Sequence, residues 1–474
     1  MITMNMKYTL ILLLAAAVAV PGFAQEKKKA SIYKKYQVFQ NVPVKIEDPD
    51  AINNYKSQLD FTVPQHGPWL TNPRPDGMTI TWITRAECAG GIEYREKGTE
   101  EFKRLWPLTY GQIDFTRKIQ YFHLTGLKPD TEYEYRFLSN ISYYGGAYHG
   151  LTCVGREIYS FRTMNPEKQN YRVFMTADFH GGGRLCMDPV LDRTGAMESD
   201  FFFFLGDNVE DGPGIHIEYY ITFGFLDDIT RRYGTSKPTI FMRGNHDIWG
   251  RDTYKYGDYF PAPDGKTYQA FRQGPVLFIC LDSMWRAKEK LQNEQHNAYL
   301  QEQADWVRAL KKTDAWKKSK FRVVMAHVAP FANESTFVEP HWLELFQDAT
   351  PEGRIHVFLS GHMHCYYRIN PGEKNVRFIN EFKDMKEDAF KKSRYLHQGL
   401  IPDNVPYTNV SLHLVEGMTL DVSADKLVFK SHRWSKPEGG LYDEFTILPD
   451  GKVVDGAKVQ IYELPPAPPV KKKK

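Results

Sequence analysis

The sequence predicts an all-β domain followed by a larger α/β domain, and three observations lead to this fold class. The chain has 474 residues, whereas single hydrophobic cores usually stop growing at about 250 to 300 residues. Residues 66–165 alternate polar and apolar side chains, most clearly in Met78–Ile83, which is typical of strands with one buried face. After Asn165 the apolar runs are continuous and alternate with helical segments, as expected of strands buried on both faces.

The two ends of the chain differ in composition from these domains. Lys7 precedes an apolar run at residues 10–20, so residues 1–24 are predicted to be a secretory signal peptide. The run is about half the roughly 20 residues that a membrane span needs. Residues 25–65 are polar and are expected to form a linker, and the Pro- and Lys-rich residues 461–474 a disordered tail. We therefore expect export to the periplasm or the cell exterior, without a transmembrane segment.

Charge and cysteine content bear on the class of partner and on the redox chemistry. The formal net charge of +3 is close to balance, so no large basic field indicates a nucleic-acid partner. The five cysteines lie far apart and do not form a disulfide framework. Cys88 and Cys153 either pair within the first domain or remain buried thiols.

The first domain contains a recognisable turn. Leu127–Tyr135 places Tyr133 and Tyr135 directly after a Pro-Asp turn, in the manner of the tyrosine corner of immunoglobulin-like sandwiches. Residues 66–165 thus resemble a fibronectin type III module. The resemblance implies a sandwich of two antiparallel sheets.

The second domain, expected at 168–460, combines helices with strands. Residues Asn297–Lys311 carry apolar side chains at three- and four-residue spacing, which predicts an amphipathic helix. His216–Tyr233 is a second helix candidate. Strands are expected to return near the end of the domain, at Val376–Phe382, Val410–Val415 and Lys426–Lys430.

Five buried-strand patterns in this domain each end in residues that can bind a metal ion. The apolar runs are Val173–Met175, Phe201–Leu205, Ile240–Met242, Val323–Met325 and Val357–Leu359. In open α/β sheets, ligands bind at the carboxyl ends of strands, so residues at five such ends can converge on one site. The residues that follow these runs are Asp178, His180, Asp207, Asn245, His327, His362 and His364.

These residue types fit a centre with two metal ions. Two cations about 3.5 to 4 Å apart need a bridging carboxylate to offset their repulsion, and Asp207 is the natural bridge. One shell would be completed by Asp178, His180 and His364, and the other by Asn245, His327 and His362. A set of carboxylate, amide and imidazole ligands without cysteine favours Fe, Zn or Mn.

The order and spacing of these motifs resemble those of the calcineurin-like metallophosphoesterases. The motifs are Asp178-Phe179-His180, Gly206-Asp207, Gly244-Asn245-His246-Asp247, His327 and Gly361-His362-Met363-His364. The segment His364–Arg368 is also similar to the closing motif of the purple acid phosphatase branch, in which an amino-terminal fibronectin-like domain is typical. The resemblance implies a four-layer αββα domain that hydrolyses phosphoesters.

Two positions depart from the purple acid phosphatase pattern. That branch follows the bridging aspartate with a tyrosine ligand of ferric iron, but this chain has Glu210 there. Conversely, His180 supplies an imidazole where the branch usually lacks one. The purple chromophore is therefore not expected.

The implied reaction assigns roles to further residues. The two cations would lower the pKa of a shared water and hold phosphate oxygens, so that a metal-bound hydroxide attacks phosphorus in line. His246 would stabilise the developing charge or protonate the leaving oxygen, and Asp247 would orient its imidazole. His341 and Arg368 are candidate substrate contacts, with a solvated loop histidine and a structural salt bridge as the alternatives.

The expected substrate is a small phosphate monoester, because the purple acid phosphatase resemblance favours monoesters. A phosphodiesterase or nucleotidase on the same dimetal core is the alternative. A rival from another class is an exported binding or adhesion protein with an inert phosphoesterase domain. The complete ligand set argues against this rival.

Overall fold

The computed structural model describes most of the two predicted domains. The described residues are 62–142, 150–210, 217–249, 252–283, 290–331, 339–374, 377–379, 402, 404–412, 416–433, 440–456 and 461–463. The expected signal peptide, nearly all of the expected linker and residues 464–474 of the expected tail lie outside them. The expectation that the tail begins at 461 is wrong, because Ile461–Glu463 forms strand β24 and pairs with β18 (Arg377–Ile379).

The first domain is an antiparallel sandwich built around one long strand, β2 (Gly77–Glu96). Its first half pairs with β1 (His66–Arg74) and β6 (Arg117–Leu124), and its second half pairs with β7 (Glu132–Ser142). This strand therefore passes from one sheet into the other. The smaller strands are β3 (Lys103–Leu105), β4 (Leu108–Thr109), β5 (Gln112–Ile113), β8 (Gly150–Val154) and β9 (Tyr159–Arg162).

Aromatic side chains fill the sandwich and confirm the expected corner. Trp82 and Phe137 are buried, with ring centroids 4.3 Å apart. The N–H of Lys128 donates a hydrogen bond to Oη of Tyr133 at 3.0 Å, which ties the strand to the preceding turn as a tyrosine corner does. Cys88 and Cys153 are both buried free thiols, so the disulfide alternative is wrong.

The second domain contains two mixed sheets whose central strands are parallel. In the first, β10 (Tyr171–Thr176) and β11 (Phe201–Phe204) are parallel. In the second, β15 (Phe321–Met325) and β16 (Val357–Ser360) are parallel. The first sheet has the order β12 (Thr239–Phe241), β11, β10, β20 (Gly417–Val422), β21 (Leu427–His432), β22 (Leu441–Ile447), β23 (Val453–Asp455). The second has the order β13 (Gln269–Gln273), β14 (Val276–Cys280), β15, β16, β19 (Thr408–Ser411), β17 (Tyr367–Ile369), β18, β24.

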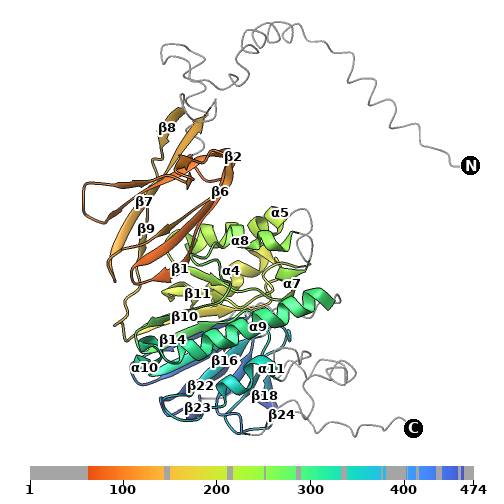
Figure 1. Ribbon diagram of the computed structural model, residues 1–474. Coiled ribbons are helices and arrows are strands. Elements are labelled where there is room, and N and C mark those ends of the chain that lie inside the picture. Colours follow the sequence, from red (N-terminus) through yellow and green to blue (C-terminus); the bar gives the residue numbers. More distant parts are fainter. Residues whose placement is uncertain are drawn as a thin grey trace, which may run out of the picture.

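The layers of this domain follow from where its apolar side chains pack. One buried core, which includes Val173, Phe201 and Val323, joins the inner faces of the two sheets. Separate cores join each outer face to helices (Figure 1). The first sheet is covered by α4 (Gly183–Arg193), α5 (Ile217–Ile221), η4 (Thr222–Leu226), α6 (Asp227–Ile229) and η5 (Thr230–Gly234), and the second by α9 (Lys290–Leu310), α10 (Asp314–Lys318), α11 (Glu339–Trp342) and η7 (Glu344–Phe346). The predicted four-layer αββα architecture is confirmed.

Both predicted helices are found. The amphipathic helix is the second half of α9, and it buries Leu300, Ala304 and Val307 against the second sheet. Gln303 anchors it, because its side-chain amide exchanges two 2.8 Å hydrogen bonds with the backbone N–H and carbonyl of Asp282. The other predicted helix is the continuous helical segment from α5 to η5, which includes two π-helical turns.

The sandwich lies against the first sheet and its helices (Figure 1). Trp69 of β1 is fully buried in the core that contains α4, and its indole N–H donates to the carbonyl of Tyr259 at 2.9 Å. The phenol of Tyr135 donates to the carbonyl of Thr235 at 2.7 Å. These two hydrogen bonds and the shared core join the two domains.

Among the described residues, none of the helices is both long enough and apolar enough to cross a bilayer.

Candidate metal centre

Each of the seven candidate ligands lies just beyond the carboxyl end of a strand. Asp178 and His180 follow β10, Asp207 follows β11, and Asn245 follows β12 at the start of the short helix α7 (Asn245–Ile248). The other three, His327, His362 and His364, follow β15 and β16 of the second sheet. The site therefore lies where the carboxyl ends of both sheets meet.

The structure brings six of the seven into two groups that share one residue. The first group is Asp178, His180, Asp207 and His364, and the second is Asp207, His327 and His362. Within each group the potential ligand atoms all lie within 4.8 Å of one another. The seventh residue adjoins the second group, since Oδ1 of Asn245 accepts a 2.9 Å hydrogen bond from Nδ1 of His362. Asp207 belongs to both groups, as expected of a bridging carboxylate.

The backbone at this site is held in an unusual conformation. Five of the candidate ligands have a positive φ between 49° and 73°. A left-handed conformation costs about 1 to 2 kcal/mol for a residue with a Cβ atom, and such strain gathers where function requires it. The five residues are Asp178, His180, Asp207, His362 and His364.

Glycines in the motifs allow the loops to approach one another. A Cβ atom on Gly361 would lie 2.6 Å from Oδ2 of Asp178. A Cβ atom on Gly206 would lie 2.7 Å from the ring of His327, and Gly206 has a φ of 106°. Any larger residue would therefore separate the ligands of the two sheets.

Two buried atoms show that the donor set fits a cation. Oδ2 of Asp207 and Nε2 of His327 face each other at 3.1 Å. Both are buried, and neither has a partner with hydrogen-bond geometry in the described part of the chain. Leaving a buried polar atom unsatisfied costs about 1 to 3 kcal/mol, and a cation between a carboxylate and an imidazole would satisfy both atoms.

Protons partly offset the negative charge of the site. Burial alone would lower the pKa of His327, but the carboxylates of Asp207 and Asp178 raise that pKa to about 9. Burial, together with the neighbouring His327, lowers the pKa of His362 to about 4. The hydrogen bond with Asp178 raises the pKa of His364. A metal ion that binds here must displace a proton from His327, so its binding releases protons.

Residues 171–366 match the family model of the calcineurin-like phosphoesterases. They form a calcineurin-like phosphoesterase domain. Among solved structures, the chain is similar to the structure of PhoD, at 11% sequence identity and a TM-score of 0.55, over 85% of this chain and 94% of that one. At this identity the likeness shows the fold alone. No curated protein matches the sequence.

A second solved structure is similar over a smaller share of the chain. It is GAP50, described as the anchor in the inner membrane complex of Plasmodium, with 12% identity and a TM-score of 0.37. The match covers 62% of this chain and 91% of that one. Neither it nor PhoD bears on the predicted purple acid phosphatase branch, which stays a prediction.

His246 of the phosphoesterase domain is directed toward Asp207, the residue that both groups of potential ligands share. Its backbone N–H donates to Oδ1 of Asp207 at 2.8 Å, and its Nε2 lies 3.9 Å from Oδ2 of the same carboxylate. Its Nδ1–H donates to the backbone carbonyl of Glu210. That bond fixes the orientation of the ring, with Nε2 facing the metal site.

Asp247 holds the backbone around His246. Its carboxylate is fully buried and accepts hydrogen bonds from the N–H groups of Gly244 at 2.8 Å and Asn208 at 3.1 Å. Burial, and after it the charge of Asp207, raises the pKa of Asp247 to about 7. The residue thus fastens the loop after β11 to the start of α7.

The substrate role predicted for Arg368 is wrong. Its side chain has no exposed surface, and its guanidinium makes two hydrogen bonds to Asp443, at 2.9 and 3.2 Å. It also donates to Asn370 at 3.0 Å. Arg368 therefore forms the structural salt bridge that was the alternative to a substrate contact.

The other predicted substrate contact, His341, lies on α11. Its Nδ1 is 3.3 Å from Oε1 of Gln301 on α9. Its role toward a substrate stays a prediction.

Sequence reasoning assigned no role in the site to three residues that lie beside it. Asn208 is fully buried, and its amide donates to the carbonyl of Met242 and to Oη of Tyr256, both at 2.8 Å. Oε2 of Glu210 lies 3.5 Å from Nδ1 of His180. The ring centroid of Trp249 lies 4.7 Å from that of His246. Their adjacency to Asp207 and to α7 in the sequence was the available signal.

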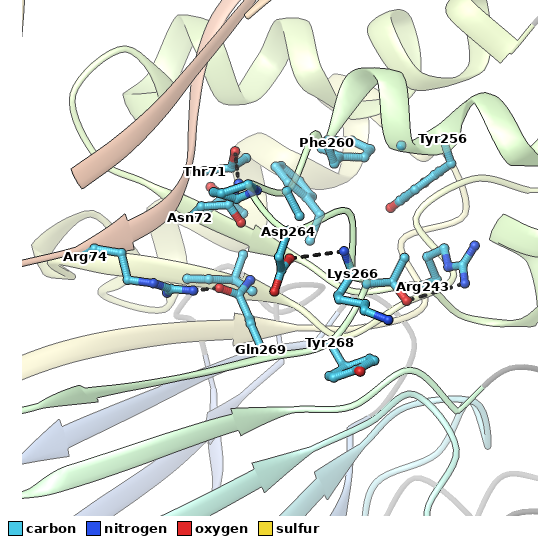
Figure 2. Close-up of a pocket in the computed structure, with 17 residues that line it drawn as sticks. Thr71, Asn72, Arg74, Arg243, Tyr256, Phe260, Asp264, Lys266, Tyr268 and Gln269 are labelled. Atoms are coloured by element: carbon cyan, nitrogen blue, oxygen red, sulfur yellow. Dashed lines mark hydrogen bonds between the residues drawn. The ribbon is translucent and has the colours of Figure 1, made fainter. Parts of the chain in front are cut away.

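A separate cavity of about 260 Å³ lies between the two domains (Figure 2). Asn72 and Arg74 of the sandwich face Arg243, Tyr256 and Lys266 of the phosphoesterase domain across it. All its lining residues differ from the seven candidate ligands. Tyr256, through its bond to Asn208, connects the cavity wall to the back of the metal site.

Proposed function

We propose that this protein is an exported phosphoesterase with two metal ions, which hydrolyses phosphate monoesters. The observation that carries the proposal is the position of Asp207, which belongs to both groups of potential ligands and has a buried oxygen without a hydrogen-bond partner in the described residues. The predicted signal peptide at residues 1–24 supports export.

The seven candidate ligands divide into two sets. In the first, Asp178, His180 and His364 would hold one cation together with Asp207. In the second, Asn245, His327 and His362 would hold the other together with the same carboxylate. Bound cations would supply the Lewis acidity that lowers the pKa of water and offsets the charge of phosphate oxygens. The ligand types favour Fe, Zn or Mn.

Protein groups around the cations would position and protonate the reactants. Because its Nδ1–H is bound to the carbonyl of Glu210, His246 presents Nε2 to the site and can deliver a proton from that atom to the leaving oxygen. Asp247 keeps α7, and with it His246, in place through the backbone of Gly244 and Asn208. Outer groups of this kind commonly set metal affinity and ligand orientation.

The first experiment measures how the release of phenol depends on metal, because hydrolysis of one ester bond frees phenol from a phenyl monoester and from a diphenyl diester alike. Metal-stripped protein would be supplied with Mn, Zn or Fe in turn and assayed against phenyl phosphate and against diphenyl phosphate. We expect release that depends on the metal and is faster for the monoester. Faster hydrolysis of the diester would favour the phosphodiesterase alternative, and no hydrolysis with any metal would favour the binding protein.

A matched pair of histidine variants tests the assignment of the ligands. His327 and His356 are both buried, but only His327 belongs to the metal groups. We expect His327→Gln to lower metal affinity by about 100-fold or more, and His356→Gln to retain both metal content and activity. Equal metal content in the two variants, measured by elemental analysis, would contradict the proposed site.

A further inference from the structure

An aromatic side chain stands beside the residue that faces the leaving oxygen. Trp249 follows α7 and lies three positions after His246, a spacing that places two residues on the same side of a helical turn. The two ring centroids are 4.7 Å apart, with an angle of 46° between the ring planes. The indole thus lies against the imidazole that faces the candidate metal site.

This indole is partly exposed to solvent although it is large and apolar. Forty per cent of its surface is exposed, and the four hydrophobic cores of the described residues do not contain it. An apolar ring that is placed at the mouth of a polar site offers a stacking face to a bound molecule. Because the neighbouring His246 would protonate the leaving oxygen, the leaving group is the part of a substrate that would reach the indole.

An exposed carboxylate borders the same place. Glu210 binds the His246 ring through its backbone carbonyl, and 63% of its side chain is exposed. Its carboxylate would repel a leaving group that carries negative charge. The combination of a ring face and a carboxylate therefore favours a leaving group that is planar, aromatic and uncharged.

We propose that Trp249 stacks on the leaving group, and that the preferred substrates are phosphate monoesters of aryl alcohols or nucleosides. This inference rests on the proposed phosphoesterase function. In the reaction, the oxygen of water forms a new bond to phosphorus while the bond from phosphorus to the leaving oxygen breaks. The leaving oxygen takes a proton from His246, the proton lost by water passes to solvent, and His246 regains a proton from solvent. Phosphate and the neutral aromatic alcohol are the products.

The test compares substrates with and without a ring in the leaving group. The measured ratio is kcat/KM for phenyl phosphate, or for adenosine 5′-monophosphate, divided by kcat/KM for glycerol 3-phosphate. We expect Trp249→Ala to lower this ratio about tenfold for both ring-containing substrates. Trp249→Phe retains a ring, so its ratio should stay within about threefold of that of the original protein. Tyr254→Ala is the control, since Tyr254 is an exposed aromatic residue of the following helical turn, and it should leave the ratio unchanged.

A binding measurement separates this inference from the proposed function. Phenylphosphonate and methylphosphonate cannot be hydrolysed at an ester bond, and their affinities for the metal-loaded protein can be measured by calorimetry. We expect Trp249→Ala to weaken phenylphosphonate about tenfold relative to methylphosphonate. An equal loss for both ligands, or for all three substrates, would overturn the role of Trp249. Absence of hydrolysis for every substrate would overturn the proposed function, and the phosphonates would still decide the role of Trp249.

Discussion

Two groups of buried polar residues differ in whether their hydrogen bonds are completed within the protein. The Arg368 cluster consists of Tyr366, Arg368, Asn370 and Asp443. Its guanidinium is bonded to the carboxylate of Asp443 and to the amide of Asn370, and the phenol of Tyr366 donates to the same carboxylate. In the seven candidate ligands, by contrast, buried atoms of Asp207 and His327 lack such partners among the described residues.

This difference separates a structural cluster from a binding site. Arg368 and His327 are both fully buried, so burial alone does not distinguish them. A buried ion pair whose atoms are bonded within the protein needs nothing from outside. Oδ2 of Asp207 and Nε2 of His327 face each other at 3.1 Å without hydrogen-bond geometry, so a proton on His327 or a bound metal ion must offset the charge of the carboxylate. The completeness of the hydrogen bonds therefore distinguishes the Arg368 cluster from the candidate metal site.

The largest effect on stability is expected from breaking the ion pair of the Arg368 cluster. Arg368→Met would leave the carboxylate of Asp443 buried without its cation. We expect the free energy of unfolding, measured with urea, to fall by about 3 to 5 kcal/mol. The double variant Arg368→Met with Asp443→Leu removes both charges and should recover most of that loss. A loss below about 1 kcal/mol in the single variant would show that the cluster is not a structural ion pair.

At the candidate metal site we expect a smaller effect on stability but a loss of both metal ions. Asp207→Asn removes the carboxylate that both groups share, so affinity for both metal ions should fall at least about 100-fold, equivalent to about 2.7 kcal/mol each. Asp178→Asn changes one group only, so one metal ion should remain. The metal content of both variants, measured after dialysis, checks this difference. Retention of two ions by Asp207→Asn would exclude a bridging role.

Sequence reasoning reached the site because its signals are local. Asp178, Asp207 and His327 each follow an apolar strand, and the carboxyl ends of parallel strands necessarily lie together. The hydrogen bonds of Arg368 were out of reach, because its partner Asp443 lies 75 positions away and on the other sheet. Glu210 and Trp249 were equally hidden, since their roles depend on which way the ring of His246 turns.

The smallest of the three effects on stability is expected at His356. This histidine is buried like His327, but both of its ring nitrogens have hydrogen-bond partners. Nδ1 of His356 accepts from the N–H of Arg322 at 3.1 Å, and its Nε2–H lies 3.1 Å from the carbonyl of Pro449. Burial lowers the pKa of His356 from 6.5 to about 4. The neutral ring is thus part of the folded structure, whereas His327 is charged in the metal-free site because its pKa is raised to about 9.

This low pKa predicts a loss of stability in mild acid. Below pH 6.5 the unfolded chain takes up a proton at His356 that the folded protein excludes until about pH 4. The free energy of unfolding therefore falls as the pH drops through this window, by about 2 kcal/mol at pH 5 relative to pH 7. His356→Gln cannot take up this proton, so its stability should not fall for this reason. Urea unfolding of the original protein and of His356→Gln, both stripped of metal, at pH 7 and pH 5 measures the difference. An identical pH dependence in the two proteins would show that the imidazole of His356 is not held neutral by the fold.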